Sequence, residues 1–196
     1  MVGSYHPALV ALSVAIASLA SYVALDLVGR VTAARGSLRS AWVGGGALGM
    51  GVGIWSMHFI GMLAFRLHAD GSTVPMAYDV PLLLLSVAVA ITASALALAV
   101  ASRERVGWIS LVVGALAMGP AIAGMHYIGM ASMRMPAALG YDSSLVALSV
   151  AIAVGAALAA LWLAFRLRDD ESRLGRLRRL GAGVIMGPAI SGMHYT

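Results

Sequence analysis

Three copies of a Met-His motif recur at a constant spacing of 68 residues. The copies are Met57-His58-Phe59, Met125-His126-Tyr127 and Met193-His194-Tyr195. Each copy lies in a long stretch without charged residues, as a membrane-spanning helix would. A polar imidazole inside a membrane is costly and is by default a candidate functional group. Three copies in register therefore predict one site to which each copy contributes a histidine.

The residue types around these histidines point to metal chemistry. On a helix, residues four apart share a face, so Met62 lies near His58 and Met130 near His126. Imidazole with thioether suits copper, and thioether favours Cu(I), whereas imidazole alone also suits zinc or haem iron. The chain has 12 methionines and no cysteine. Methionine stripes in apolar helices are more often packing, and a single membrane histidine is as often structural as ligating. We predict a metal or haem site with these candidate ligands: His58, His126, His194, Met57, Met125, Met193, Met62 and Met130.

Four further residues lie at matching places near the motifs. Tyr127 and Tyr195 follow their histidines, where they are expected either to hydrogen-bond behind the ligands or to anchor the helices at the membrane interface. Pro120 and Pro188 lie six residues before His126 and His194. Because proline removes a helical hydrogen bond, we predict hinges at these two positions.

The composition predicts an all-α membrane protein. The chain is 61% hydrophobic and 11% charged, with a mean hydropathy of +0.92. Runs of about 20 apolar residues are typical of transmembrane helices. The expected spans are about 7–28, 41–65, 80–101, 107–132, 144–165 and 180–196. They are too many and too evenly spaced for a soluble core.

The arginines predict the orientation. All 13 basic residues are arginine, and 11 of them fall between spans one and two, three and four, or five and six. Loops rich in basic residues stay in the cytoplasm, so the N-terminus is expected outside. The histidines then lie in the outer half of the bilayer, since His58 and His126 are each eight residues, about 12 Å, before the outer residues Arg66 and Arg134. The net charge of +5 is thus a topology signal, and we do not expect nucleic acid as a partner.

The helices form a threefold internal repeat. Tyr5-His6, Tyr78-Asp79 and Tyr141-Asp142 open units of about 5–66, 78–134 and 141–196, and each unit contains an inward helix, a basic loop and an outward helix with Met-His. Parallel repeats of this kind predict three helix hairpins around a pseudo-threefold axis, within a single domain of residues 1–196. Gly45, Gly49 and Gly53 also form a small-xxx-small pattern that predicts close helix packing.

At these residues the chain resembles the MHYT domain of bacterial membrane sensors. The closing Met193-His194-Tyr195-Thr196 is the family motif itself, the second copy ends in Ile128, and the first has Phe59 in place of tyrosine. The resemblance covers the whole chain. It implies a multi-pass sensor domain of the bacterial inner membrane that holds copper through its Met, His and Tyr residues near the outer face. It also implies a diatomic gas (oxygen, carbon monoxide or nitric oxide) as the signal, and cytoplasmic modules, often for cyclic di-GMP turnover, as the output.

Several expectations and alternatives follow. We expect no enzymatic activity in this chain itself, which we interpret as the sensor portion of a longer protein, and we consider a homodimer. A copper transporter is one alternative, although no histidine and only scattered methionines lie toward the inner side. A haem or copper oxidoreductase is a second alternative. In a third, the histidines are satisfied core residues of a helical scaffold that docks a partner.

Overall fold

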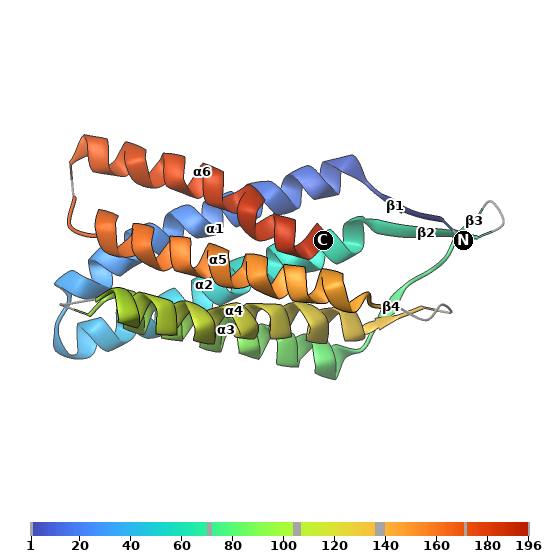
Figure 1. Ribbon diagram of the computed structural model, residues 1–196, viewed down its shortest axis with the longest axis horizontal. Helices are drawn as coiled ribbons and strands as arrows, with labels where there is room; N and C mark the ends of the chain where they lie inside the picture. The colour runs from blue at the N-terminus through green and yellow to red at the C-terminus, as the bar shows by residue number, and fades with distance from the viewer. Residues whose placement is uncertain (1, 70–71, 104–106, 136–139, 171, 196) are drawn as a thin grey trace.

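In the computed structural model, which describes residues 2–69, 72–103, 107–135, 140–170 and 172–195, helices dominate (Figure 1). These helices are α1 (Pro7–Ala33), α2 (Gly36–Ala64), α3 (Val80–Ala101), α4 (Trp108–Ala131), α5 (Ser143–Leu167) and α6 (Arg173–Tyr195). The strands are β1 (Val2–Tyr5), β2 (Phe65–Ala69), β3 (Ser72–Thr73), β4 (Ala77–Tyr78) and β5 (Met133–Arg134). Arg105 and Thr196, which belong to the predicted basic loop and family motif, lie outside the described residues.

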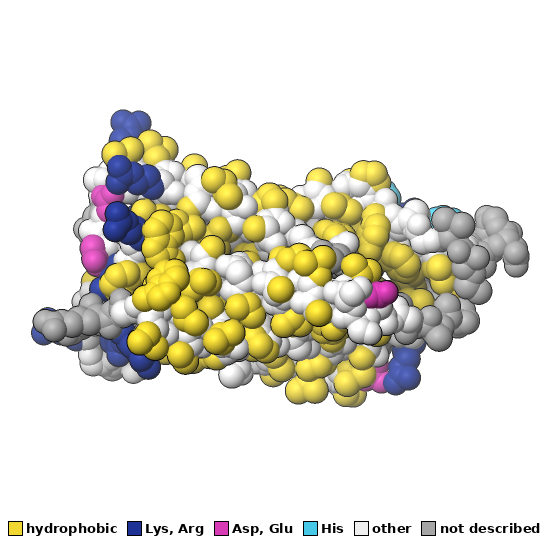
Figure 2. All heavy atoms as spheres, in the orientation of Figure 1, with side chains coloured by type: hydrophobic (Ala, Val, Ile, Leu, Met, Phe, Trp, Pro, Cys, Tyr) yellow, Lys and Arg dark blue, Asp and Glu magenta, His cyan; other side chains and the backbone are white. Residues whose placement is uncertain are grey.

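The helices lie side by side in an elongated bundle whose long axis they follow (Figure 1). Each helix packs against the next along the chain, and α6 packs against α1, so the six described helices close into a ring. All five strands lie at one end of the bundle, which we call the strand end. The opposite end, where α1 is followed by α2 and α5 by α6, carries most of the arginines, and we call it the arginine end (Figure 2).

The helices agree with the membrane prediction in most respects. Five of them, α1 to α5, are long and apolar enough to cross a membrane. The helix α6 begins at Arg173, earlier than the predicted span at 180, and its first turns carry several arginines that lower its hydropathy. A broad hydrophobic surface covers the middle of the bundle, with charged side chains gathered toward its two ends (Figure 2). The chain therefore has the fold of a multi-pass membrane protein.

The strand end was not predicted, since the sequence pattern indicated helices alone. β1 pairs antiparallel with β2, placing Tyr5 opposite Phe65, and β4 pairs with β5, placing Tyr78 opposite Met133. In each case the residues that enter a hairpin pair with the residues that leave it. The strands were missed because they are short, and a strand needs a partner rather than a local pattern. Their effect is to fix the strand-end termini of the first two hairpins.

The repeated Tyr-Asp openings have a local structural role. Asp79 accepts a hydrogen bond from the Leu82 backbone and caps α3, and Asp142 likewise caps α5 by accepting from the Ser144 and Leu145 backbones. A carboxylate at this position satisfies backbone N–H groups that the first helical turn leaves free. His6 occupies the corresponding position before α1 and makes no such side-chain hydrogen bond.

Glycines set the distance between neighbouring hairpins. Gly51, Gly119 and Gly187 are again 68 residues apart, and a Cβ built on any of them would lie within 2.6–2.8 Å of backbone atoms of the adjoining helix, α3, α5 or α1. No side chain fits at that distance, so these glycines permit close helix contact. The predicted glycine ridge is wrong at Gly45 and Gly49, because a Cβ there would meet no described atom within 4 Å.

Candidate metal centre

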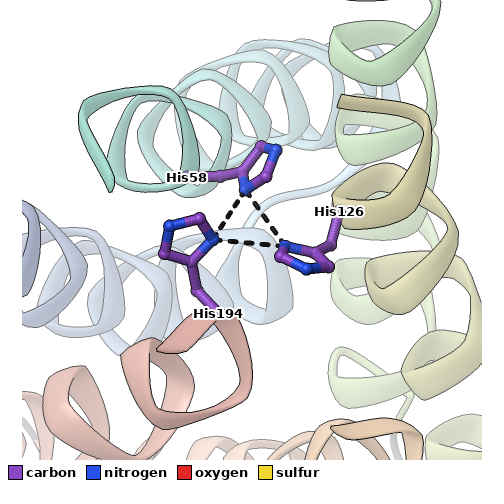
Figure 3. A group of neighbouring side chains, drawn as sticks. All are labelled: His58, His126 and His194. Atoms are coloured by element: carbon purple, nitrogen blue, oxygen red, sulfur yellow. Dashed lines mark hydrogen bonds between the residues drawn. The ribbon is translucent and has the colours of Figure 1, made fainter. Parts of the chain in front are cut away.

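The three even-numbered helices bring His58, His126 and His194 together inside the bundle, toward the strand end (Figure 3). Their Nδ1 atoms form a nearly equilateral triangle: 3.0 Å between His58 and His194, and 3.2 Å for each of the other two pairs. The residues are 1%, 6% and 9% exposed, respectively. The 68-residue spacing thus corresponds to one shared cluster of three buried imidazoles.

Hydrogen bonding among the rings cannot satisfy this triangle. A ring nitrogen of neutral imidazole is either a donor or an acceptor, never both. If two Nδ1 atoms carry protons, those two donors face each other, and if only one does, two lone pairs face each other. Every choice of tautomers therefore leaves one repulsive contact of about 3 Å inside a buried site. A cation bound by three unprotonated Nδ1 atoms would remove the conflict.

The size of the triangle also fits an ion. A point in the plane of the three nitrogens and equidistant from them lies about 1.8 Å from each, and bonds of about 2.0–2.1 Å are typical of zinc and imidazole. A small displacement from the plane brings the two values together. The three histidines satisfy the distance criterion for a group that could hold a metal ion, and no other described His, Asp or Glu cluster does so.

Two glycines close the outer edges of the rings. A Cβ on Gly129 would collide with Nε2 of His58, and a Cβ on Gly61 would collide with Nε2 of His194. His194 also hydrogen-bonds to the Gly61 backbone, whereas His58 Nε2 is buried without a partner among the described residues. Both glycines lie three residues after the histidine of their own unit, so each unit closes around a neighbour's ring. Sequence reasoning missed them, although the shared His-x-x-Gly spacing was a usable signal.

The candidate methionines lie on two sides of the histidines. Met62, Met130 and Met193 line a cavity of about 260 Å³ at the strand end, which His126 and His194 line as well. Met57 and Met193 line a second cavity on the arginine side of the cluster. Met125 is fully buried and is not among the described lining residues of either cavity. The structure therefore places five buried or half-buried thioethers around the triad, with Met193 between the two cavities.

The tyrosine hydroxyls are engaged by serines of the neighbouring unit. Tyr127 bonds to Ser149 of α5 at 2.6 Å, and Tyr195 bonds to Ser13 of α1 at 2.8 Å. Each of these serines donates its own proton to a backbone carbonyl of its helix, so the tyrosines are the donors. The rings of Tyr127 and Tyr195 lie edge-on to those of their preceding histidines. The tyrosines thus tie adjacent hairpins together at the level of the triad.

The first unit replaces this bond by another. Phe59 has no hydroxyl, and Trp55 instead donates to Ser86 of α3 at 3.0 Å while its ring stacks on Phe59. Ser86 corresponds to the two serines that receive tyrosine hydroxyls, and like them it is buried. All three junctions between hairpins therefore carry a side-chain hydrogen bond to a buried serine.

An apolar cavity of about 90 Å³ lies on the arginine side of the triad, along the centre of the bundle. Its lining includes Met50, Met118 and Met186, which precede the motifs by seven residues, and it extends to Leu25 and Leu161. Among the described residues that line it, Ser21 is the single one with a polar side chain. Apolar cavities of this kind stay dry and bind small apolar molecules.

Pro120 and Pro188 lie in the interior of α4 and α6 without interrupting either helix. Each directly follows a contact glycine, Gly119 or Gly187, whose close packing against the next hairpin fixes that turn of the helix. Their function as hinges stays a prediction.

Ionisable groups at the strand end surround the larger cavity. Burial raises the pKa of the Tyr141 phenol, and the neighbouring Tyr127 adds to the effect. Burial also raises the pKa of Tyr5, with a further contribution from Tyr195. These phenols therefore stay protonated and neutral, and hydrogen bonds from Ser144 keep the pKa of Asp142 below its ordinary value.

Comparison with known proteins places this arrangement in a family. The family profile described as "Bacterial signalling protein N terminal repeat", MHYT, matches residues 51–114 and 119–176. The chain belongs to the MHYT family. The two matched segments are successive copies of the repeat, in agreement with the tandem hairpins. No solved structure matches the chain.

Several curated relatives contain a region similar to the whole chain. The chain is 50% identical over its full length to the bifunctional diguanylate cyclase/cyclic di-GMP phosphodiesterase MucR of Pseudomonas aeruginosa. It is 42% identical to the cyclic di-GMP phosphodiesterase NbdA of the same organism and 35% identical to the signaling protein YkoW of Bacillus subtilis, over 98% of the chain in both cases. It spans only 28%, 24% and 24% of these three proteins. The chain therefore corresponds to the MHYT sensor part of multidomain signalling proteins.

Proposed function

We propose that the chain is a membrane sensor domain that binds one copper ion through Nδ1 of His58, His126 and His194. The observation that carries the proposal is the triangle of buried Nδ1 atoms, which hydrogen bonding alone leaves with one repulsive contact. Three imidazoles would equally accept zinc. The surrounding buried thioethers, Met57, Met193 and Met62 among them, favour Cu(I), because soft ligands select that ion.

We propose that all six helices cross the bacterial inner membrane as three hairpins around a pseudo-threefold axis, with the N-terminus outside. The closed ring of helices and the 68-residue repeat support the axis. The gathering of arginines at one end supports the orientation, since basic loops stay in the cytoplasm. The arginine-rich start of α6 would then lie at the cytoplasmic surface, with its apolar remainder in the bilayer.

We propose that the signal is a diatomic gas (oxygen, carbon monoxide or nitric oxide) or a change in redox state. The apolar cavity on the arginine side of the triad supports a gas, because it offers a neutral, poorly hydrated molecule a place beside the histidines. The protein's own part would be to hold three neutral imidazoles and exclude water on that side. A bound copper ion would supply an electron-transfer or gas-binding centre.

The same cavity bears on the transporter alternative. A copper ion that crossed from the triad to the arginine end would need polar or charged ligands along the way, and the described cavity lining offers Ser21 alone besides thioethers. We therefore propose sensing rather than transport. Net copper movement into proteoliposomes that contain the purified chain would contradict this conclusion.

We propose that the output lies in a cytoplasmic module of the full-length protein. Two of the relatives are named for cyclic di-GMP synthesis or degradation, and this chain spans about a quarter of their length. The chain itself would then be non-enzymatic. The inter-hairpin bonds from Tyr127 and Tyr195, together with hinges at Pro120 and Pro188, offer a route by which a change at the triad would tilt α4 and α6. A homodimer of the full-length protein stays a prediction.

The first experiment is to measure the metals bound to the chain after purification without chelator. The comparison is a triple variant, His58→Ala, His126→Ala and His194→Ala. We expect about one copper per wild-type chain and none in the variant. Stoichiometric zinc would replace the metal assignment, an absorption band of haem would favour the oxidoreductase alternative, and a chain that takes up no metal on reconstitution would leave the histidines a structural role.

Gas or redox sensing needs a separate measurement. The copper-loaded chain is exposed to carbon monoxide, nitric oxide or oxygen, and its infrared and visible spectra are compared with those of the chain with zinc bound. A ligand band that appears with copper alone would support gas binding. Identical spectra before and after all three gases, with full reversibility between oxidised and reduced copper, would leave redox state as the signal.

A further inference from the structure

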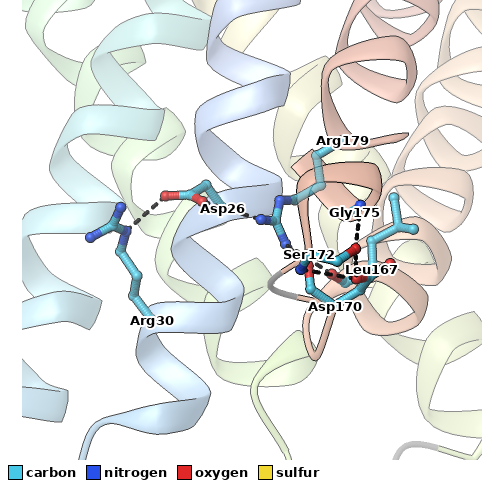
Figure 4. Close-up of polar contacts among 7 residues, drawn as sticks. All are labelled: Asp26, Arg30, Leu167, Asp170, Ser172, Gly175 and Arg179. Atoms are coloured by element: carbon cyan, nitrogen blue, oxygen red, sulfur yellow. Dashed lines mark hydrogen bonds and ion pairs between the residues drawn. The ribbon is translucent and has the colours of Figure 1, made fainter. Parts of the chain in front are cut away.

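A third hollow lies at the arginine end, far from the histidines and independent of metal binding. Its volume is about 300 Å³. The residues that line it come from α1, the C-terminal end of α5 and the start of α6. They are Asp26, Gly29, Arg30, Ala33, Arg168 and Arg179. Figure 4 shows Asp26 of α1 between the guanidinium groups of Arg30 and Arg179.

Two of these arginines are buried, which is unusual for this residue type. The side chain of Arg168 is 7% exposed and that of Arg179 is 6% exposed. Arg168 donates to the backbone carbonyls of Ala101 and Arg103, beside the end of α3, and Arg179 donates to the carbonyl of Leu167 at the end of α5. Carbonyls at helix C-termini carry partial negative charge and hold both guanidinium groups in place.

These carbonyls do not neutralise the charge that the hollow contains. Asp26 is the one carboxylate among the described lining residues, and its oxygens lie 2.7 Å from Arg30 and 3.8 Å from Arg179. Three arginines against one aspartate leave a net charge of +2. Nε of Arg179 is also buried without a hydrogen-bond partner among the described residues. Buried charge without a partner is costly, so the hollow favours an anion.

The shape and location of the hollow narrow the kind of anion. Guanidinium groups bind phosphate oxygens in a bidentate manner, and Arg30, whose side chain is 54% exposed, can turn its remaining N–H groups toward a ligand. The hollow lies where the hydrophobic surface of the bundle meets the arginines (Figure 2). That is the level of lipid headgroups if the helices cross a membrane, and basic pockets between helices at this level bind anionic headgroups.

We propose that this hollow binds the phosphate group of an anionic phospholipid and thereby fixes the start of α6 against α1. Gly29 and Ala33 keep the α1 side of the hollow free of bulky side chains. The ligand oxygens would lie among Nε of Arg179 and the N–H groups of Arg30. A free phosphate ion has the same recognition chemistry, so the test separates these two sources.

The test measures lipid retention by the intact chain in a neutral, phosphate-free detergent, using native mass spectrometry. The probes are phosphatidylglycerol, zwitterionic phosphatidylcholine and inorganic phosphate. We expect phosphatidylglycerol to be retained and to raise the unfolding temperature, and phosphatidylcholine to do neither. If inorganic phosphate displaces phosphatidylglycerol and stabilises the chain equally, free phosphate is the ligand and the lipid assignment is overturned.

Variants locate the binding. Arg30→Gln should weaken retention about fivefold, the effect of one arginine near an anionic surface. Ala33→Leu should weaken it at least as much, because it fills the hollow and leaves every charge in place. Arg176→Gln is the matched control, since Arg176 is exposed on the same turn of α6 and does not line the hollow. If Arg176→Gln weakens retention as much as Arg30→Gln, or if Ala33→Leu has no effect in a folded chain, the proposal is wrong.

Discussion

Replacing Gly129 by alanine should disrupt the histidine site without removing any candidate ligand atom. A Cβ at this position would lie 2.9 Å from Cδ2 of His58 and closer still to its Nε2. Ordinary contacts begin near 3.4 Å, so the imidazole or the α4 backbone must move by roughly 1 Å. Because metal–nitrogen bonds tolerate only about 0.2 Å, Nδ1 of His58 would leave the triad.

The expected loss is about 10- to 100-fold in copper affinity, the usual effect when support for a ligand is removed. Affinity is measured by competition with a chromogenic Cu(I) chelator on the detergent-solubilised chain. Gly124→Ala is the matched control: it lies on the same helix, and its Cβ would meet no described atom within 4 Å. The control should keep full affinity and gain about 0.5–1 kcal/mol of stability, because alanine favours helix over glycine.

Two outcomes would refute this reasoning. If Gly129→Ala binds copper within about twofold of wild type while circular dichroism shows the same helicity, the position of His58 does not depend on this contact. If Gly124→Ala loses affinity as well, the effect comes from α4 as a whole rather than from the ring of His58.

Three further predictions concern the contacts that hold the hairpins. Tyr127→Phe and Ser149→Ala should each destabilise the fold by about 1 kcal/mol and should be non-additive when combined, as a double-mutant cycle of thermal unfolding would measure; additive losses would mean that the two hydroxyls do not interact. Gly119→Ala should cost about 1–3 kcal/mol, because its Cβ would lie 2.7 Å from an α5 backbone atom, and an unchanged unfolding temperature would contradict the close helix contact. Arg134, by hydrogen bonding at 2.6 Å, holds the pKa of Asp79 below 3.8 in the folded chain. The stability from this pair is therefore present above about pH 4 and is lost as the pH falls through the lower folded value, so Asp79→Asn should remove this part of the acid dependence, and identical pH–stability curves for both proteins would count against it.

The sequence by itself determined the repeat and the helices. The 68-residue spacing of the Met-His motifs and the long charge-free runs predicted hairpins with one histidine on each even helix, because hydrophobic stretches and repeats are local properties of a chain. The helix boundaries were less accurate where charged residues extend a helix beyond its apolar part. The start of α6 at Arg173 is the clearest case, since the end of an apolar run is not the end of a helix.

The details of the candidate site depended on tertiary structure. Sequence could not tell which imidazole nitrogen of His58 faces the other rings, that Gly129 bounds its far edge, or that Tyr127 donates to Ser149 of the next hairpin. Each of these contacts joins residues on different helices, and its geometry follows from side-chain rotamers and from the separation of the helix axes. A local pattern fixes which residues lie on a helix face, whereas only the packed bundle decides which partner each side chain meets.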